Sequence, residues 1–335
     1  MRRLAPLTVL GLLALAACGK GGTLGSGFPT PAPPTPPKVT GEFKVPTAGG
    51  QPAGIARGAD GALYFTEQAA NKVGRIAVDG TLTEFALPNG GGPFGITSGP
   101  DNNLWLVERT GNRVAKMTLT GTFTEYAIPT PNAGAAYITT GPDGQLWFTE
   151  QSAGKIGFIN PTAVTPVVQE VALANAGAGP SAITAGPDGA LYFTEITASK
   201  IGRINTQGQV TFEVPTPTAN AQPSSIVQFQ DGYLWFTENG AAKLGRVSTQ
   251  GVMTPEISLA PATSAAGLVI GSDNAFYFLD AAQNSVGQVK ILGTPGVKEF
   301  AITTAASGPL NATLGTDGRV YFTETTGNQI GQLSY

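Results

Sequence analysis

The stretch Gly141–Glu150, GPDGQLWFTE, combines residues that could do chemistry: a tight Gly-Pro-Asp-Gly turn, an aromatic pair and a terminal carboxylate. A carboxylate can serve as a general acid or base, or as a ligand for a hard cation. The same phrase returns as GPDGALYFTE at Gly186–Glu195. The repeated glutamate is therefore either a piece of chemistry or a piece of the scaffold.

The composition limits the chemistry that is available. The chain has 335 residues, a net charge of −3, one cysteine and no histidine. Without histidine the chain lacks the commonest general base and the commonest metal ligand, so catalysis would depend on carboxylates, lysine, tyrosine or hydroxyls. There is no basic stripe, which argues against a nucleic-acid partner.

The turn acid marks a repeat of seven units. Asp60, Asp101, Asp143, Asp188, Asp231, Asp273 and Asp317 lie 41–45 positions apart, and an aromatic residue follows each of them by four positions. A second acid follows by seven positions, as Glu67, Glu108, Glu150, Glu195, Glu238, Asp280 and Glu324. A functional site uses one special place, so we interpret this seven-fold acid as structural.

A cation in five units predicts how this acid is used. It comes five residues after the acid, as Lys72, Arg113, Lys155, Lys200 and Lys243. We expect an ion pair within the hairpin, or a carboxylate that holds a loop amide.

Each unit is predicted to contain four short strands, which in the first unit cover 54–57, 62–66, 71–78 and 82–87. Asx-Gly turns between β-rich runs favour hairpins, and four strands at this repeat length are typical of a propeller blade. The last unit lacks a fourth strand, and Gly41–Pro46 resembles the fourth-strand phrase of the other units. The sequence thus predicts an all-β, seven-bladed β-propeller over 41–335, closed by an N-terminal strand that completes the last blade.

The N-terminal segment resembles a bacterial lipoprotein signal. Two arginines precede an apolar run, Leu7–Ala17, and the run ends in Leu-Ala-Ala-Cys. We expect a signal peptide over 1–17, lipidation at Cys18 and a Gly/Pro-rich tether over 18–40. The propeller would then be anchored to a membrane of the cell envelope and face the periplasm or the exterior. The alternative is an ordinary cleaved signal with an incidental cysteine.

Function is expected where residues break the repeat near the axial channel. Phe94, Arg109, Tyr137 and Asn239 do so, and we predict that they line one sector of the channel mouth. A small molecule, a peptide or an envelope protein would bind there. Ordinary loop variation is the alternative reading of these four residues.

The motifs together resemble the virginiamycin B lyase family, from about Gly41 to Tyr335. They are Pro-x-Gly-Ile, Gly-Pro-Asp-Gly-x-Leu-Trp-Phe-Thr-Glu, Asn-x-Ile-Gly-Arg-Ile and Gly-x-x-Thr-Glu-(Phe/Tyr)-x-(Leu/Ile)-Pro. The resemblance implies Mg²⁺-assisted elimination that opens the macrocycle of streptogramin B antibiotics. It also implies histidines at two strand-one positions and acids at two positions of the seventh blade.

This chain departs from the family at those four positions, which hold Ala266, Leu310, Gly308 and Thr325. Glu324, next to the last of them, is the only candidate metal ligand. We therefore expect a non-catalytic binding protein without a cofactor. The alternatives are a Mg-dependent lyase with relocated residues, a lactonase-like metal enzyme, and a purely structural surface protein.

Overall fold

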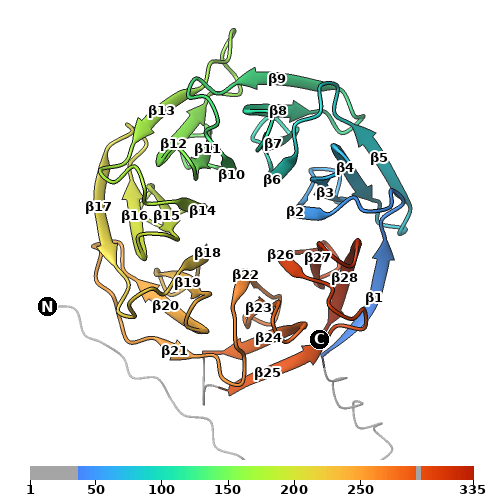
Figure 1. Ribbon diagram of the computed structural model, residues 1–335, viewed down its shortest axis with the longest axis vertical. Helices are drawn as coiled ribbons and strands as arrows, with labels where there is room; N and C mark the ends of the chain where they lie inside the picture. Colours follow the sequence, from blue (N-terminus) through green and yellow to red (C-terminus); the bar gives the residue numbers. More distant parts are fainter. Residues whose placement is uncertain (1–36, 292–295) are drawn as a thin grey trace, which may run out of the picture. The chain divides into compact units, whose positions relative to one another are not determined.

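A computed structural model describes residues 37–291 and 296–335, and Figure 1 shows them as a ring of blades around a common centre. Each of the seven sheets has four antiparallel strands, as predicted. The predicted signal peptide, Cys18 and the tether up to residue 36 lie outside the described residues. No helix within 37–291 or 296–335 is long and apolar enough to cross a membrane.

The strands of each blade follow one another from the centre outward. The innermost strands are β2 (Pro52–Arg57), β6 (Pro93–Ser98), β10 (Ala135–Thr140), β14 (Pro180–Ala185), β18 (Pro223–Gln228), β22 (Ala266–Ile270) and β26 (Pro309–Leu314). The second strands are β3 (Leu63–Glu67), β7 (Leu104–Glu108), β11 (Leu146–Glu150), β15 (Leu191–Glu195), β19 (Leu234–Glu238), β23 (Phe276–Asp280) and β27 (Val320–Glu324). The third strands are β4 (Lys72–Ile76), β8 (Arg113–Met117), β12 (Lys155–Ile159), β16 (Lys200–Ile204), β20 (Lys243–Val247), β24 (Ser285–Lys290) and β28 (Gln329–Ser334). The outermost strands are β5 (Leu82–Ala86), β9 (Phe123–Ala127), β13 (Gln169–Ala172), β17 (Val210–Pro215), β21 (Ile257–Ser258), β25 (Gly296–Ala301) and β1 (Lys38–Lys44). We number the blades 1 to 7 from β2 to β26.

The N-terminal strand closes the ring as predicted. β1 pairs antiparallel with β28, and it begins at Lys38, earlier than the predicted boundary at Gly41. Its Glu42 accepts hydrogen bonds from the amide and hydroxyl of Thr304 at 2.9 and 2.8 Å. Glu84 of blade 1 accepts the same pair of bonds from Thr47 at 2.8 and 2.7 Å. β1 therefore has both the pairing and the side-chain contacts of a fourth strand.

The packing between strands two and three explains a glycine that recurs in the repeat. A Cβ on Gly202 would lie 2.1 Å from the Phe193 ring, and the same clash occurs in five other blades. Blade 2 is the exception, because Leu106 takes the place of the phenylalanine and Ala115 faces it. The phenylalanine and the glycine are thus two halves of one packing solution.

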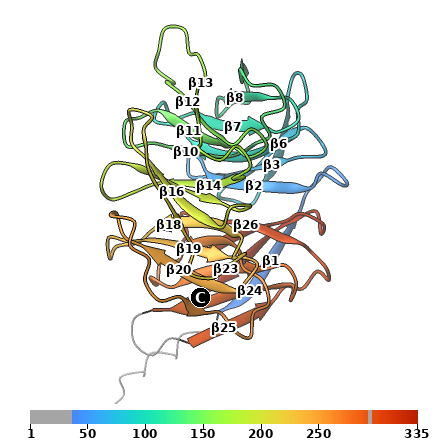
Figure 2. The ribbon, with the colours of Figure 1, turned by 60° about the vertical axis from the view of Figure 1, so that its left-hand side comes forward.

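The connections divide the ring into two faces. The loops between strands two and three, and those between blades, lie at one face, which we call the loop face. The turns that join strands one and two, and strands three and four, lie at the other, which we call the turn face. Loops project from both sides of the ring in Figure 2. Because Lys38 pairs with Ser334 at the end of β28, the chain enters the ring at the turn face.

Candidate functional site

The seven-fold acid of strand two is fully buried in every blade, with no exposed surface at any of the seven positions. The predicted ion pair within the hairpin forms only between Arg113 and Glu108, at 2.7 Å. In blades 1, 3 and 5 the prediction is wrong, because the lysine pairs with a glutamate on strand four or, in blade 5, directly before it. These pairs are Lys72–Glu84 at 2.6 Å, Lys155–Glu170 at 2.9 Å and Lys243–Glu256 at 2.6 Å. Near the blade edge the lysine can keep its ammonium partly in water, which a pair with a fully buried acid would not allow.

Most of these buried glutamates are left without a hydrogen-bond partner within the described part of the chain. Both carboxyl oxygens of Glu67, Glu150, Glu195, Glu238 and Glu324 are in this state. Burial, and then the adjacent Glu256, raises the pKa of Glu238 to about 8. Burial and the charge of Glu84 raise the pKa of Glu67 to about 7. We interpret these side chains as neutral carboxylic acids in the blade interior.

Asp280 occupies the same position in blade 6, but its surroundings favour the ionised carboxylate. It accepts hydrogen bonds from the amide of Thr263 at 2.8 Å, the hydroxyl of Ser264 at 2.6 Å and the amide of Gln283 at 3.0 Å. Burial opposes ionisation, but these bonds outweigh it and hold the pKa of Asp280 below its usual range. Here the prediction of a carboxylate that holds loop amides is correct.

Three of the four predicted site residues meet at the loop-face end of the inner strands. The rings of Phe94 and Tyr137 lie edge to face with centroids 5.5 Å apart. The guanidinium of Arg109 lies 4.9 Å from the Phe94 centroid and donates to the side-chain oxygen of Gln151. Arg109 forms no ion pair with a carboxylate of the described residues. The Phe94 ring is buried, whereas Tyr137 and Arg109 are partly exposed. The cluster of Phe94, Arg109 and Tyr137 therefore places a cation without a counterion beside an aromatic pair.

This cluster also reaches across the centre of the ring. The side-chain amide nitrogen of Asn311 in blade 7 donates to the Tyr137 hydroxyl of blade 3 at 3.3 Å. It also donates to the backbone carbonyl of Ala53 in blade 1 at 3.2 Å. Leu310 packs against the same apolar cluster as Phe94 and Ala53. Side chains from blades 1, 2, 3 and 7 thus contact one another around the axis.

Asn239 does not join this cluster. It follows strand two of blade 5, and its side-chain oxygen accepts a hydrogen bond from the amide of Ala265 at 3.1 Å. It fastens the loop that leads into blade 6.

The residues at the four family positions do not fit a Mg²⁺ site. Ala266 and Leu310 have no donor atoms, Gly308 has no side chain, and the Thr325 hydroxyl donates to the carbonyl of Pro52 at 2.7 Å. Glu324 is buried within blade 7, where one of its oxygens would lie 2.7 Å from a Cβ on Gly331. No three acids, cysteines or histidines of the described residues are grouped so that they could hold a metal.

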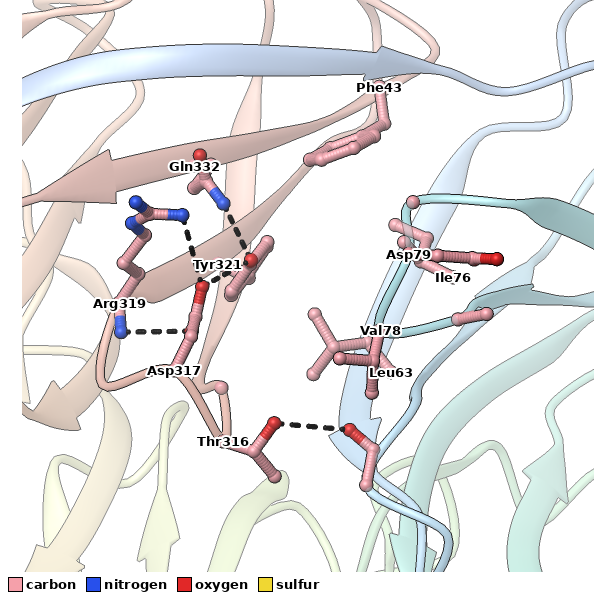
Figure 3. Close-up of a pocket in the computed structure, with 14 residues that line it drawn as sticks. Phe43, Leu63, Ile76, Val78, Asp79, Thr316, Asp317, Arg319, Tyr321 and Gln332 are labelled. Atoms are coloured by element: carbon pink, nitrogen blue, oxygen red, sulfur yellow. Dashed lines mark hydrogen bonds and ion pairs between the residues drawn. The ribbon is translucent and has the colours of Figure 1, made fainter.

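A pocket that the sequence analysis missed opens between blades 7 and 1, at the turn face (Figure 3). Its volume is about 320 Å³. Asp317, Arg319, Tyr321 and Gln332 form its polar wall in blade 7. Its apolar side is formed by Phe43 from β1 and by Leu63, Ile76 and Val78 from blade 1. One sequence feature could have indicated this pocket. The strand-three residue that faces the strand-two aromatic is glutamine in the last two blades only.

Comparison with known proteins agrees with the seven-bladed propeller fold. The sequence profile of the Virginiamycin B lyase family matches residues 35–255 and 90–335. A streptogramin B lyase structure is 31% identical with a TM-score of 0.82, covering 88% of this chain and 96% of that one. Virginiamycin B lyase from Staphylococcus aureus is 30% identical with a TM-score of 0.82, covering 90% of this chain and 100% of the other. A catalytically inactive histidine-to-alanine variant of the Staphylococcus enzyme with quinupristin is 30% identical with a TM-score of 0.83. The chain belongs to the virginiamycin B lyase family.

Proposed function

We propose that this chain is a membrane-tethered propeller of the cell envelope that binds a ligand at its loop face and does not catalyse the lyase reaction. The observation that carries the proposal is the cluster of Phe94, Arg109 and Tyr137. It provides the Arg109 cation and hydrogen-bond donors beside an aromatic pair, and it contains no carboxylate, lysine or histidine that could remove a proton from a substrate. A small molecule with carbonyl or anionic groups suits this chemistry, and a peptide or a segment of an envelope protein would offer the same groups.

The relatives support binding without turnover. The Staphylococcus variant that lacks one histidine is catalytically inactive, and its structure contains quinupristin. This chain has no histidine at any position. An elimination needs a base and, in this family, a metal that polarises the ester, and the matching positions supply neither. The alternative function, Mg-dependent elimination or a lactonase-like reaction, would need a carboxylate in place of the histidine base.

Tethering is supported by Cys18, which follows the apolar run Leu7–Ala17 and the Leu-Ala-Ala triplet typical of bacterial lipoprotein signals. The whole chain, expressed in a bacterial host with radioactive palmitate, tests the anchor. We expect the chain to be labelled and the Cys18→Ser variant to lose the label. Equal labelling of the variant would contradict the anchor.

Equilibrium titration with quinupristin tests the loop-face site, using residues 36–335, which form one compact unit. We expect binding that Arg109→Ala weakens by about ten- to a hundredfold, since a hydrogen bond to a charged group contributes roughly 1.5–3 kcal/mol. Asn239→Ala is the matched control and should bind like the unmodified chain. Equal loss in both variants would contradict a site centred on Phe94, Arg109 and Tyr137, and an absence of binding would remove this class of ligand.

A further inference from the structure

The pocket between blades 7 and 1 exists because one element of the repeat is missing there. In six blades the aromatic ring of strand two is at most 3% exposed, whereas Tyr321 in blade 7 is 8% exposed. The six rings are covered by Arg75, Lys116, Phe158, Arg203, Arg246 and Tyr335, at centroid distances of 4.5–5.9 Å. The residue that faces Tyr321 is the shorter Gln332.

Blades 1 and 4 show what the aromatic ring and the turn acid bind when the repeat is complete. In blade 4 the guanidinium of Arg203 lies 5.8 Å from the Tyr192 centroid and donates to Asp188 at 2.8 Å and to the Tyr192 hydroxyl at 3.1 Å. Arg75 makes the corresponding contacts in blade 1. The arrangement of ring, carboxylate and phenol is therefore a guanidinium site built from the repeat itself.

Blade 7 keeps this site but lacks the internal arginine. Asp317 accepts from the Tyr321 hydroxyl at 2.9 Å, and Gln332 donates to the same hydroxyl at 2.5 Å. Arg319 reaches Asp317 only at 3.3 Å, and its side chain is 49% exposed. Asp317 also accepts from the backbone amide of Arg319 at 3.1 Å. A carboxylate with these three partners, of which only the exposed Arg319 side chain is a cation, retains a lone pair for a second cation on the pocket side.

The apolar residues of the pocket determine the rest of the ligand. The buried Leu63 and Ile76 of blade 1 line the same 320 Å³ cavity as the partly exposed Phe43 of β1, whose ring centroid lies 6.3 Å from that of Tyr321 (Figure 3). We propose that this pocket binds an organic cation, a guanidinium or ammonium group on a short apolar chain, with its charge at Asp317 and its chain against Phe43 and Leu63. The site lies at the turn face and is independent of the proposed loop-face site.

Calorimetric titration of residues 36–335 with hexylguanidinium tests the proposal, with hexanol and hexanoate as neutral and anionic comparators. We expect hexylguanidinium to bind with a dissociation constant on the order of 1 mM or below, as the modest size of the ligand implies. Neither comparator should bind detectably in the same range. Equal binding of hexanoate, or no binding of the cation, would overturn the proposal.

Variants locate the site and its charge preference. Gln332→Arg restores the repeat arginine, fills the pocket and should abolish binding. Gln329→Lys adds a positive charge to the same strand outside the pocket, likewise restores a repeat residue, and should leave binding unchanged. Arg319→Ala removes the competing cation and should tighten binding, whereas a loss of binding in this variant would show that the pocket selects anions. Thermal melting of each variant confirms that it is folded.

Discussion

A single position of the repeat exists in two charge states in this propeller. Glu238 and the four other glutamates without a hydrogen-bond partner favour the neutral form, because burial and a second nearby carboxylate outweigh any neighbouring positive charge. Asp280 is shorter, has Ser285 in place of a lysine on the facing strand, and gathers loop hydrogen bonds that stabilise the anion. The type of acid and its surroundings, not its place in the repeat, decide the state.

This contrast predicts opposite effects of two isosteric substitutions. Because the folded-state pKa of Glu238 is raised from 4.5 to about 8, its stabilising contribution is complete below about pH 4.5 and is lost as the pH rises toward 8. Glu238→Gln should therefore stabilise the fold at pH 8.5 relative to the unmodified chain, by on the order of 1–3 kcal/mol, and have little effect at pH 4.5. Urea unfolding at the two pH values measures the difference.

Asp280→Asn is the matched control for that experiment. The pKa of Asp280 is lowered, so its contribution is present above the usual aspartate range and is lost only as the pH falls. The substitution should lower the unfolding free energy at pH 8.5 by about 1–3 kcal/mol, the cost of disrupting a buried charged acceptor. Stabilisation by Asp280→Asn, or destabilisation by Glu238→Gln at pH 8.5, would contradict the two assigned charge states.

At the scale of the elements, each blade depends on a matched pair across strands two and three. Phe193 fills the space that Gly202 leaves, and Leu106 with Ala115 fills a similar volume in another way. This explains why Ala115 could replace the repeat glycine in blade 2 alone.

Substitutions that exchange one residue pair for the other should have strongly coupled effects on stability. Gly202→Ala should destabilise the fold by about 1–3 kcal/mol, since its Cβ would overlap the fully buried Phe193 ring. Leu106→Phe should be destabilising for the same reason, and Leu106→Phe with Ala115→Gly should recover at least 1 kcal/mol, a coupling of roughly the size seen for residues in contact. Additive effects in denaturant unfolding would show that the pairs are independent.

The sequence was sufficient to predict the architecture but only part of the candidate site. Seven copies of one pattern predicted the blades, and the absent fourth strand predicted the closure by β1. The ion pairs were mispredicted, because the alternative partner on strand four comes from a different part of the repeat. The contact between Tyr137 and Asn311 could not be predicted, since it joins residues 174 positions apart across the ring and follows no period.

In the whole molecule, the residues that repeat in the blades build the ring, and the residues that break the repeat form the candidate binding sites. The buried acids, the phenylalanine–glycine pairs and the β1 closure maintain seven equivalent blades. Features specific to one place are found only where blades differ: the Phe94, Arg109 and Tyr137 cluster at the loop face, and the pocket beside Gln332 at the turn face. The family's fold is intact, while the positions expected to carry its chemistry hold apolar or backbone-bound residues.

We propose that this member of the virginiamycin B lyase family binds a ligand without catalysing the lyase reaction. The most direct test incubates residues 36–335 with a streptogramin B antibiotic and excess Mg²⁺, followed by mass spectrometry and chromatography of the product. We expect an intact macrocycle after prolonged incubation. A linear product of unchanged mass would demonstrate elimination, a gain of one water would demonstrate hydrolysis, and either would show that the chain is an enzyme.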